Sequence, residues 1–473
     1  MREALDRFFG FSELGTNPKR EIAAGLTTFL TMAYIIFVNP AILSGQMTGK
    51  ETGMDFGALT MATCLSAAIA TAIMGLLARY PVALAPGMGE NFFFVTTVLP
   101  IAAATGHPEP WRAALGAVFV SGVLFFLISL SGIRRYLLEA LSSSLKNGIA
   151  VGIGLFIAFI GLQGAQIILK NPGSGVSLNP HLFAPDPLLF LITFTVIAVL
   201  QARRVRGAIL WGIAIGAVLA CCARLVVDHF PALAQSSWLK GSMLLTRFEW
   251  AHGITAAPPS LAPTFFKMDI GAAFTTQLIP IVLVFLFMDM FDTMGTLVGV
   301  AEQAGLMRGQ ELPRAEKAFL ADATGTVLGA AMGTSTVTSY IESLAGVEQG
   351  GRTGLTALTT AVLFLVALFF SPIIKMIASY PAITAPAVVM VGAMMMRNVT
   401  KIEWTDPTEA IPAFVAVAGI PMTYSISDGL ALSLLSYPVI KLLAGRGREV
   451  PKTMYVLAVL LILYFALVRS RLG

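Results

Sequence analysis

Long apolar runs without Asp, Glu, Lys or Arg recur along almost the whole chain. A helix needs about 20 mostly apolar residues to cross a bilayer. Uninterrupted runs near that length lie at 22–49, 56–78, 113–133, 147–169, 187–202, 207–223, 270–288, 323–341, 353–374, 376–396, 410–427 and 453–468. Two more runs, 82–104 and 429–445, are each broken by one charged residue, Glu90 and Lys441.

The run at 323–341 is too crowded for one helix, and Gly333 divides it into a span and the start of the next. This division predicts an all-α polytopic membrane protein with fourteen transmembrane segments. The remaining segment, 453–468, is short and is followed by Arg469 and Arg471. We expect it to be an extra C-terminal helix at the cytoplasmic interface.

The longest loop, 228–269, separates two halves of seven segments and is predicted to be external. An odd number of spans per half gives the halves opposite orientations, as in transporters built from inverted repeats. Segments 3 and 10 each begin with an extended or Pro-broken stretch that is followed by a carboxylate. We therefore predict two inverted repeats with broken, extended stretches in segments 3 and 10.

The composition agrees with a membrane protein, since 56% of residues are hydrophobic and only 12% are charged. Soluble chains are about a quarter charged, so a soluble globule is excluded, and so is a disordered chain. The three cysteines lie in apolar stretches and do not suggest a disulfide framework.

The net charge of +5 is explained by topology. Residues 1–20 carry mixed charges and resemble no cleavable signal, so we place the N-terminus in the cytoplasm. Most of the 31 Lys and Arg residues then fall in cytoplasmic loops, as expected for a multi-pass protein of the cell (inner) membrane. The basic excess therefore calls for a lipid bilayer but no nucleic acid.

Carboxylates inside the apolar runs are the candidate functional groups, because ionisable groups at membrane depth are costly. Asp289 and Asp292 lie three residues apart in LVFLFMDMFDTMG and share a helix face. Glu342 follows an extended stretch, and Glu90 precedes Asn91 just after Pro86. The alternative is that these groups cap half-helices or satisfy buried backbone groups.

These side chains suit recognition of a flat, polar heterocycle. A carboxylate accepts two hydrogen bonds and can read a ring N–H edge, whereas an Asn amide offers both a donor and an acceptor. Phe92 and its two Phe neighbours could stack on such a ring or serve as ordinary core aromatics. All four histidines fall in predicted external loops, so any proton coupling would use Asp or Glu. No metal, nucleotide or nucleophile motif is present, and we expect no cofactor beyond a proton gradient.

Six motifs together resemble the AzgA-like hypoxanthine/guanine/adenine permease family. They are REIAAGLTTFLTMAYIIFVNPAIL at 20–43, APGMGENFFF at 85–94, SLKNGIAVGIGLFIAFIGLQ at 144–163, MDMFDTMGTLVGV at 288–300, TSTVTSYIESLAGVEQGGRTGL at 334–355 and EAIPAFVAVAGIPMTYSISDGLAL at 409–432. The family belongs to the nucleobase/ascorbate transporter superfamily and is similar in fold to the uracil permease UraA.

The resemblance implies two domains that move against each other. Segments 1–4 and 8–11 form a core at 21–133 and 270–374, and segments 5–7 and 12–14 form a gate at 147–227 and 376–445. Short antiparallel strands in segments 3 and 10 would meet at the substrate. Members carry purine bases inward with protons, and relatives are often dimers, so a homodimer is implied here.

Residue roles also carry over from the family motifs. Asn91, Asp289 and Glu342 are implied as contacts of the base, and Asp292 is implied in proton coupling or substrate binding. Asp289 and Glu342 are further proton-coupling candidates. The predicted substrate contacts are completed by four residues: Phe92, Ser343, Thr27 and Glu90. Glu90 departs from the family pattern, which is commonly apolar at that position, and could shift base preference or cap the helix.

The predicted function is therefore a proton-coupled symporter that imports purine nucleobases such as hypoxanthine, guanine or adenine by an elevator-like motion. One alternative keeps the fold with another cargo, namely xanthine, uracil or an anion. A second alternative is an intramembrane enzyme in which Asp289 and Glu342 form a carboxylate dyad. The absence of a nucleophile motif and the inverted repeat argue against an enzyme.

Overall fold

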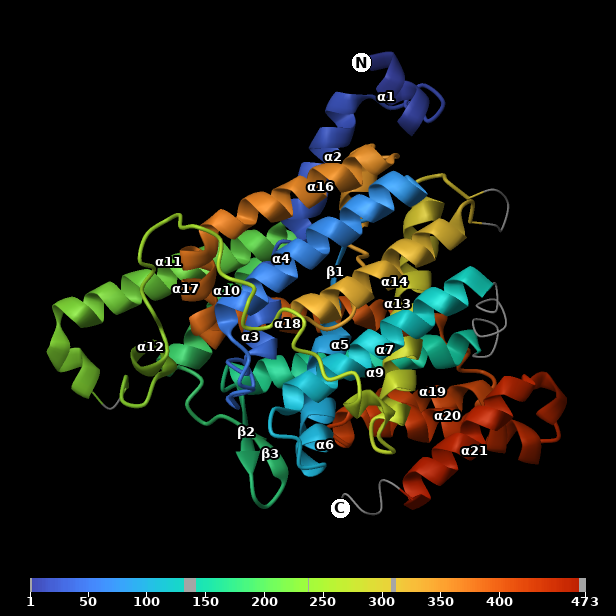
Figure 1. Cartoon of the computed structure of the whole chain (residues 1–473). Helices are drawn as coiled ribbons and strands as arrows, with labels where there is room; N and C mark the ends of the chain where they lie inside the picture. The colour runs from blue at the N-terminus through green and yellow to red at the C-terminus, as the bar shows by residue number, and fades with distance from the viewer. Residues whose placement is uncertain (1, 132–141, 237, 308–311, 468–473) are drawn as a thin grey trace.

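The chain is a mostly helical membrane protein in the computed structural model, which describes residues 2–131, 142–236, 238–307 and 312–467 (Figure 1). The last residues of the predicted runs 113–133 and 453–468 lie outside these ranges. Within them, nine helical stretches are long and apolar enough to cross a membrane. They are Pro18–Leu43, Phe56–Ala78, Pro110–Ser131, Ser143–Gly164, Pro185–Ala202, Ala208–His229, Ile279–Gln303, Gly354–Ser379 and Pro381–Lys401.

The first half of the chain contains two short π-helices and a half-helix that follows a strand. Its elements are α1 (Arg2–Phe9), α2 (Pro18–Met32), α3 (Ile35–Leu43), α4 (Phe56–Ile73), η1 (Met74–Ala78), β1 (Leu84–Pro86), α5 (Met88–Phe93), η2 (Phe94–Val98), α6 (Leu99–Ala104), α7 (Pro110–Ser131), α9 (Ser143–Gly164), the hairpin β2 (Ile168–Asn171) and β3 (Gly175–Leu178), α10 (Pro185–Ala202) and α11 (Ala208–His229).

The second half again places one short strand before a short helix. Its elements are η3 (Pro231–Gln235), α12 (Met243–Thr246), η4 (Ala272–Phe274), α13 (Ile279–Gln303), α14 (Ala315–Met332), β4 (Val337–Ser339), α15 (Ser343–Glu348), α16 (Gly354–Ala367), η5 (Leu368–Phe370), α17 (Ser371–Ser379), α18 (Pro381–Met395), η6 (Met396–Lys401), α19 (Pro407–Met422), α20 (Ile426–Leu443), η7 (Gly447–Glu449) and α21 (Lys452–Leu467).

Polar N-cap residues begin many of these helices. Each such side chain accepts a hydrogen bond from a backbone N–H of the first turn, which would otherwise lack a partner. The residues that do so are Asn17, Asp55, Ser142, Ser242, Thr353, Asp406 and Ser425. These caps help the ends of apolar helices to be read from the sequence.

The run predicted at 270–288 is misplaced in the structure. Helix α13 begins only at Ile279 and continues to Gln303, so Asp289 and Asp292 lie in its interior. The prediction took each span as a run without charged residues, so it ended this span just before Asp289. A carboxylate that finds partners inside the protein does not stop a transmembrane helix, and for that reason the criterion failed here.

Two short strands from distant parts of the chain pair near the centre of the molecule. Strand β1 runs antiparallel to β4, with Leu84 opposite Ser339 and Pro86 opposite Val337. The predicted breaks near Pro86 and Ser339 coincide with these strands. The N–H of Tyr340 donates to the Ala83 carbonyl oxygen at 2.9 Å and extends the pairing.

The helices around the strands pack into two groups. Helices α2, α4, α7, α13, α14, α15 and α16 contact one another around the strand pair, whereas α9, α10, α11, α18, α19 and α20 contact one another beside it. Small residues allow close approach in both groups. A Cβ on Gly354 would collide with the Gly75 backbone, and a Cβ on Gly148 would lie 2.8 Å from the Ala413 Cα.

The long segment 228–269 is tied to the helices on both sides. Asp186 accepts hydrogen bonds from the Ser242 hydroxyl at 2.7 Å and from the Tyr380 hydroxyl at 2.6 Å. Farther along, the Thr264 hydroxyl donates to the Met332 carbonyl oxygen at 2.7 Å. These anchors hold the connector against both helix groups.

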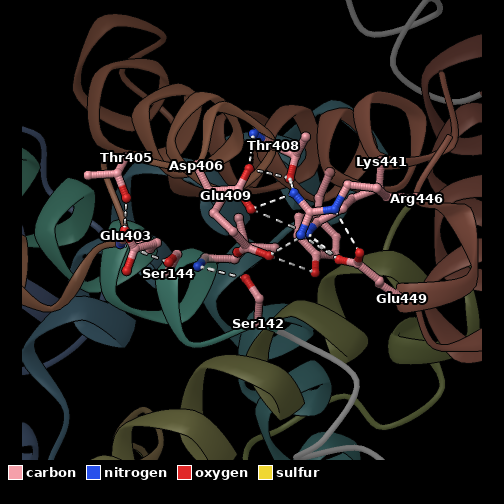
Figure 2. Close-up of polar contacts among 12 residues, drawn as sticks. Ser142, Ser144, Glu403, Thr405, Asp406, Thr408, Glu409, Lys441, Arg446 and Glu449 are labelled. Carbon is pink, nitrogen blue, oxygen red and sulfur yellow. Dashed lines mark hydrogen bonds and ion pairs between the residues drawn. The ribbon is translucent and has the colours of Figure 1, made fainter. Parts of the chain in front are cut away.

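A cluster of opposite charges joins α19, α20 and η7 (Figure 2). Lys441 is 2% exposed, and its ammonium lies 3.0 Å from Glu409 Oε1 and 2.9 Å from Glu449 Oε2. Arg446 binds both oxygens of Glu449 and lies 2.7 Å from Asp406 Oδ2. The cluster therefore fixes the chain that leads into α21, which packs against α20. Placement of α21 at the interface stays a prediction.

Hydrogen bonds lower the pKa of two carboxyls in this cluster. The Thr408 hydroxyl and then Arg446 lower the pKa of Asp406 to about 2, and Arg446 and then Lys441 lower that of Glu449 to about 2. Stability from these pairs is present above the ordinary carboxyl pKa of about 4. It is lost as the pH falls through the lowered folded-state values.

The cluster predicts a difference between two lysines. Lys441→Met should lower the free energy of unfolding by about 2 kcal/mol, because Glu409 would be left largely buried without its nearest counter-charge. Lys375→Met is the matched control, since Lys375 pairs with Glu249 while both side chains are more than half exposed. The control should change stability by less than about 1 kcal/mol. Equal shifts in thermal unfolding of the two purified variants would contradict the structural role of Lys441.

Candidate functional site

The strand pair places Glu342 against the first transmembrane stretch. Glu342 follows β4 and directly precedes α15, and its Oε1 accepts a 2.7 Å hydrogen bond from the Tyr34 hydroxyl. The Thr31 hydroxyl donates to the Glu342 carbonyl oxygen at 3.3 Å. Glu342 is half-buried, so part of it still faces open space. The tyrosine therefore orients the carboxylate without covering it.

Asp292 differs from its neighbours because it is exposed although it lies in the interior of α13. It interacts electrostatically with Glu342 and Thr338 across the end of β4. The nearby Gly295 is also exposed, and a Cβ built there meets nothing within 4 Å. Asp292 and Glu342 are therefore electrostatic neighbours beside the strand pair, and neither residue is fully buried.

Asp289 lies three residues before Asp292 on α13 and, unlike Asp292, is fully buried. Its Oδ2 accepts a 2.7 Å hydrogen bond from the Thr326 hydroxyl of α14. On the same helix, Asp322 accepts hydrogen bonds from Thr293 at 2.6 Å and from Ser339 at 3.1 Å. Asp289 and Asp322 interact directly, yet each keeps one buried oxygen without a donor. One proton between the two carboxyls would satisfy both oxygens.

Asn91 lies on α5, at the start of the first half-helix, and is fully buried. Its Oδ1 accepts a short hydrogen bond from the Ser335 hydroxyl, while its Nδ2 has no partner in the structure. Glu90, also buried, folds back over Gly87 and interacts electrostatically with Asp292 and Asp289. The residues of both strand-containing segments therefore meet around α13.

Three other predicted contacts have roles within the protein. Phe92 is fully buried in the main apolar cluster. The Ser343 hydroxyl accepts a 3.0 Å hydrogen bond from the Ala83 N–H and so joins the strand region to α15. The Thr27 hydroxyl donates to Ala23 of its own helix at 3.0 Å. Thr31, one helical turn later, and Tyr34, two turns later, make the contacts with Glu342.

The capping alternative does not explain the carboxylates of α13 and β4. Asp289 and Asp292 lie far from either end of α13, and the Glu342 side chain makes no capping hydrogen bond to α15. Only Glu90 lies in a first helical turn, that of α5. Capping therefore remains an interpretation for Glu90 alone.

Two residues of the polar network were missed by the sequence reasoning. Asp322 stands in AFLADATGTVLG directly before the charge-free run 323–341. The predicted span therefore began after Asp322 and did not include it. Tyr34 is a polar-tipped aromatic within LTMAYIIFV and was not singled out. Carboxylates flanked by apolar and small residues on both sides would have identified Asp322. Among the described residues, no three His, Cys, Asp or Glu side chains are grouped to hold a metal ion.

The chain is similar to known permeases over nearly its whole length. A sequence model described as Permease family matches residues 19–432. A putative permease of Methanocaldococcus jannaschii is 48% identical over 98% of both chains. The guanine/hypoxanthine permease PbuG of Bacillus subtilis is 41% identical over 98% of this chain and 99% of its own. The adenine permease AdeP of Escherichia coli is 37% identical over 97% and 95%.

Solved structures show the same fold at low sequence identity. The transmembrane domain of the cyanobacterial bicarbonate transporter BicA matches with a TM-score of 0.60 and 15% identity, over 88% of this chain and 97% of that domain. A murine solute carrier 26 anion transporter in the inward-facing state matches with a TM-score of 0.61 and 9% identity, over 90% and 68%. At these identities the likeness concerns the fold.

Proposed function

This chain belongs to the Permease family, and from that premise we propose that it imports purine nucleobases in symport with protons. The observation that carries this proposal is the group of acceptor side chains at the strand pair, above all Asp292 and Glu342, which lie near each other and are not fully buried. Its similarity to guanine/hypoxanthine and adenine permeases supports a purine as the cargo.

The geometry supports recognition of the N–H edge of the base. Charged carboxylates accept stronger hydrogen bonds than neutral groups, and a purine ring presents N–H donors in one plane. Glu342 is held for this by the Tyr34 hydroxyl, and Asn91 adds a free amide donor. An acceptor-rich site next to an amide fits a base with both donors and acceptors.

The alternatives are weaker for specific reasons. Homologous chains are named permeases, so the chain is a transporter and the enzyme alternative is dropped. An anion cargo is disfavoured because Asp292 and Glu342, the two carboxylates nearest the strand pair that are not fully buried, repel anions. Xanthine and uracil remain second candidates, since they also present ring N–H groups.

Proton coupling is assigned to the network that runs through α13. Asp289 and Asp322 are buried together, and two carboxylates this close cannot both ionise without large repulsion. Thr293 bridges Asp322 to Thr338, which lies beside Asp292. A change of proton occupancy at the buried pair is therefore connected by hydrogen bonds to the substrate side.

The transport motion would carry the strand pair past the second helix group. In this proposal, fourteen segments form two inverted repeats, with the core at 21–133 and 270–374 and the gate at 147–227 and 376–445. The separate packing of the two helix groups supports such an elevator-like motion. The protein would lie in the cell (inner) membrane with its N-terminus in the cytoplasm, as a homodimer.

Uptake into proteoliposomes tests the function directly. Radiolabelled hypoxanthine, guanine, adenine, xanthine and uracil are offered with and without an inward proton gradient. Gradient-dependent uptake of at least one purine is expected. Absence of gradient-dependent uptake for every base would contradict the proposal, and uptake of uracil alone would replace the purine by a pyrimidine.

Glu342→Gln is predicted to abolish base binding, because a neutral amide cannot replace the charge-assisted acceptor pair. The matched control is Glu348→Gln at the exposed end of the same short helix, which should bind like the wild type. Calorimetric titration of both variants with hypoxanthine measures the effect. Unchanged affinity in Glu342→Gln would remove this residue from the site.

Asp322→Asn is predicted to separate transport from its driving force. The asparagine keeps acceptor capacity for Thr293 and Ser339 but cannot exchange a proton at neutral pH. Base binding and base exchange should persist, whereas accumulation driven by the proton gradient should be lost. Asp228→Asn, in the exposed pair with Arg224, serves as the control. Gradient-driven accumulation at the wild-type level in Asp322→Asn would exclude the pair from proton coupling.

Glu90→Leu is predicted to retain uptake but to change the relative preference among bases. The reason is that Glu90 interacts electrostatically with Asp292 and Asp289. Its removal therefore changes the number of hydrogen-bond acceptors and the electrostatic potential at the site. Competition of unlabelled bases against labelled hypoxanthine gives the preference order. If that order equals the wild-type order, Glu90 is structural.

A further inference from the structure

A cavity of about 680 Å³ lies between the two helix groups, apart from the carboxylate site. The residues that matter here come from η2, α6, α9, β2, the long connector and the turn after α19: Thr96, Leu99, Gln163, Lys170, Arg247 and Tyr424. A volume of this size falls within the range of small-molecule sites. Because Ile168, Leu169 and Lys170 of β2 line it, the cavity lies beside the β2–β3 hairpin, which the proposed topology places on the external side.

Tyr424 gives this cavity an aromatic wall. Its ring is 41% exposed and packs edge-on against Phe156 and Phe159 of α9. Its hydroxyl donates to Gln163 Oε1 at 2.9 Å. Tyr424 also has a positive φ of 53°, a conformation that a bulky side chain rarely adopts. Such strain concentrates at functional positions, where the surroundings hold the residue in place.

The charges around the cavity favour a ligand with acceptor atoms. Lys50, Lys170 and Arg247 face a single carboxylate, that of Glu51. Gln163 uses its carbonyl oxygen for Tyr424, which leaves its amide N–H groups as donors. This cavity is therefore rich in donors, whereas the site at Asp292 and Glu342 is rich in acceptors.

A donor-rich cavity and an acceptor-rich site match the acceptor edge and the N–H edge of a 6-oxopurine. A 6-oxopurine presents acceptors at O6 and N7, which Arg and Lys recognise, whereas adenine presents an amino donor in place of O6. An aromatic side chain can stack on the ring of either base. The cavity therefore distinguishes oxopurines from adenine by its donors.

The cavity is also connected to the carboxylate site through one half-helix. The Thr96 hydroxyl in η2 donates to the Phe92 carbonyl oxygen at 2.7 Å, one turn beyond Asn91. The same continuous stretch then lines the cavity with Leu99 and Pro100. The cavity wall and Asn91 therefore belong to one continuous helical stretch, about one turn apart along it.

We propose that the cavity at Tyr424, Gln163 and Arg247 is a second binding site, which captures 6-oxopurines before they reach the carboxylates. This inference rests on the proposed function for its place in transport, but the binding itself does not. The site adds oxopurine selectivity upstream of translocation.

Cysteine protection in purified protein tests the binding without transport. All three native cysteines are replaced, Glu342→Gln removes the carboxylate site, and Ala103→Cys places a thiol in the cavity wall. Hypoxanthine should slow maleimide labelling of this thiol, and adenine should slow it less. Ser174→Cys, exposed at the tip of the hairpin and not among the lining residues, is the matched control. Its labelling should not respond to either base.

Two further variants test whether Tyr424 and Arg247 hold the base that protects the thiol from maleimide. Tyr424→Leu should weaken hypoxanthine protection about tenfold, within the range that loss of one stacking ring gives. Arg247→Gln should weaken hypoxanthine protection more than adenine protection, because it removes the guanidinium fork that can donate to O6 and N7 together, and adenine presents only N7 of these two acceptors. Equal protection by hypoxanthine in Tyr424→Leu and in its parent would overturn the proposal, and so would absence of protection in the parent.

The same two measurements separate this proposal from the function it rests on. Protection at Ala103→Cys together with no uptake of any base by wild-type proteoliposomes would keep the binding site and reject purine import. Uptake by the wild type without protection would keep purine import and reject the second site.

Discussion

Pairing of β1 with β4 is the constraint on which the rest of the structure depends. Backbone N–H and C=O groups that leave a helix inside an apolar protein need other partners, because each unpaired group costs several kcal/mol in hydrocarbon. Here Leu84–Pro86 and Val337–Ser339 satisfy one another across two distant segments. Side chains then complete the arrangement, as Thr71 binds Leu84 and Ser343 binds the Ala83 N–H. The pairing keeps both chain breaks at one place.

The polar residues of α13 are divided by this pairing into two environments. Asp289 points to α14 and is sealed with Asp322, whereas Asp292 lies near Glu342 and is exposed. Residues three apart share a helix face in general, yet the neighbouring helices decide what each one meets. A sealed pair suits the storage of a proton, and an exposed carboxylate suits contact with a ligand. In the proposed symport, one helix would therefore carry both the proton-binding pair and a ligand contact.

The periphery is organised by charges of different burial. The Lys441 cluster closes the end of α20, and each of its two cations, buried Lys441 and half-exposed Arg446, is paired with carboxylates. The cavity at Tyr424 is the opposite case, because Lys50, Lys170 and Arg247 line open space there. Lys and Arg side chains therefore stabilise the fold in the Lys441 cluster, whereas in the cavity at Tyr424 they offer hydrogen-bond donors to a ligand. Burial, together with the number of carboxylates within reach, makes the difference.

The sequence by itself determined the class of the protein, most of its apolar helices and the two breaks near Pro86 and Ser339. These features depend on local composition, on Pro and Gly, and on the cost of charge in hydrocarbon, all of which are visible along one chain. It could not place the start of α13, find Asp322 and Tyr34, or separate Asp289 from Asp292. Those outcomes depend on which side chains meet across separate segments, which lie 29 residues apart for Thr293 and Asp322 and 308 residues apart for Tyr34 and Glu342. Only the tertiary structure decides that, because a buried polar group is defined by its partners and not by its neighbours in sequence.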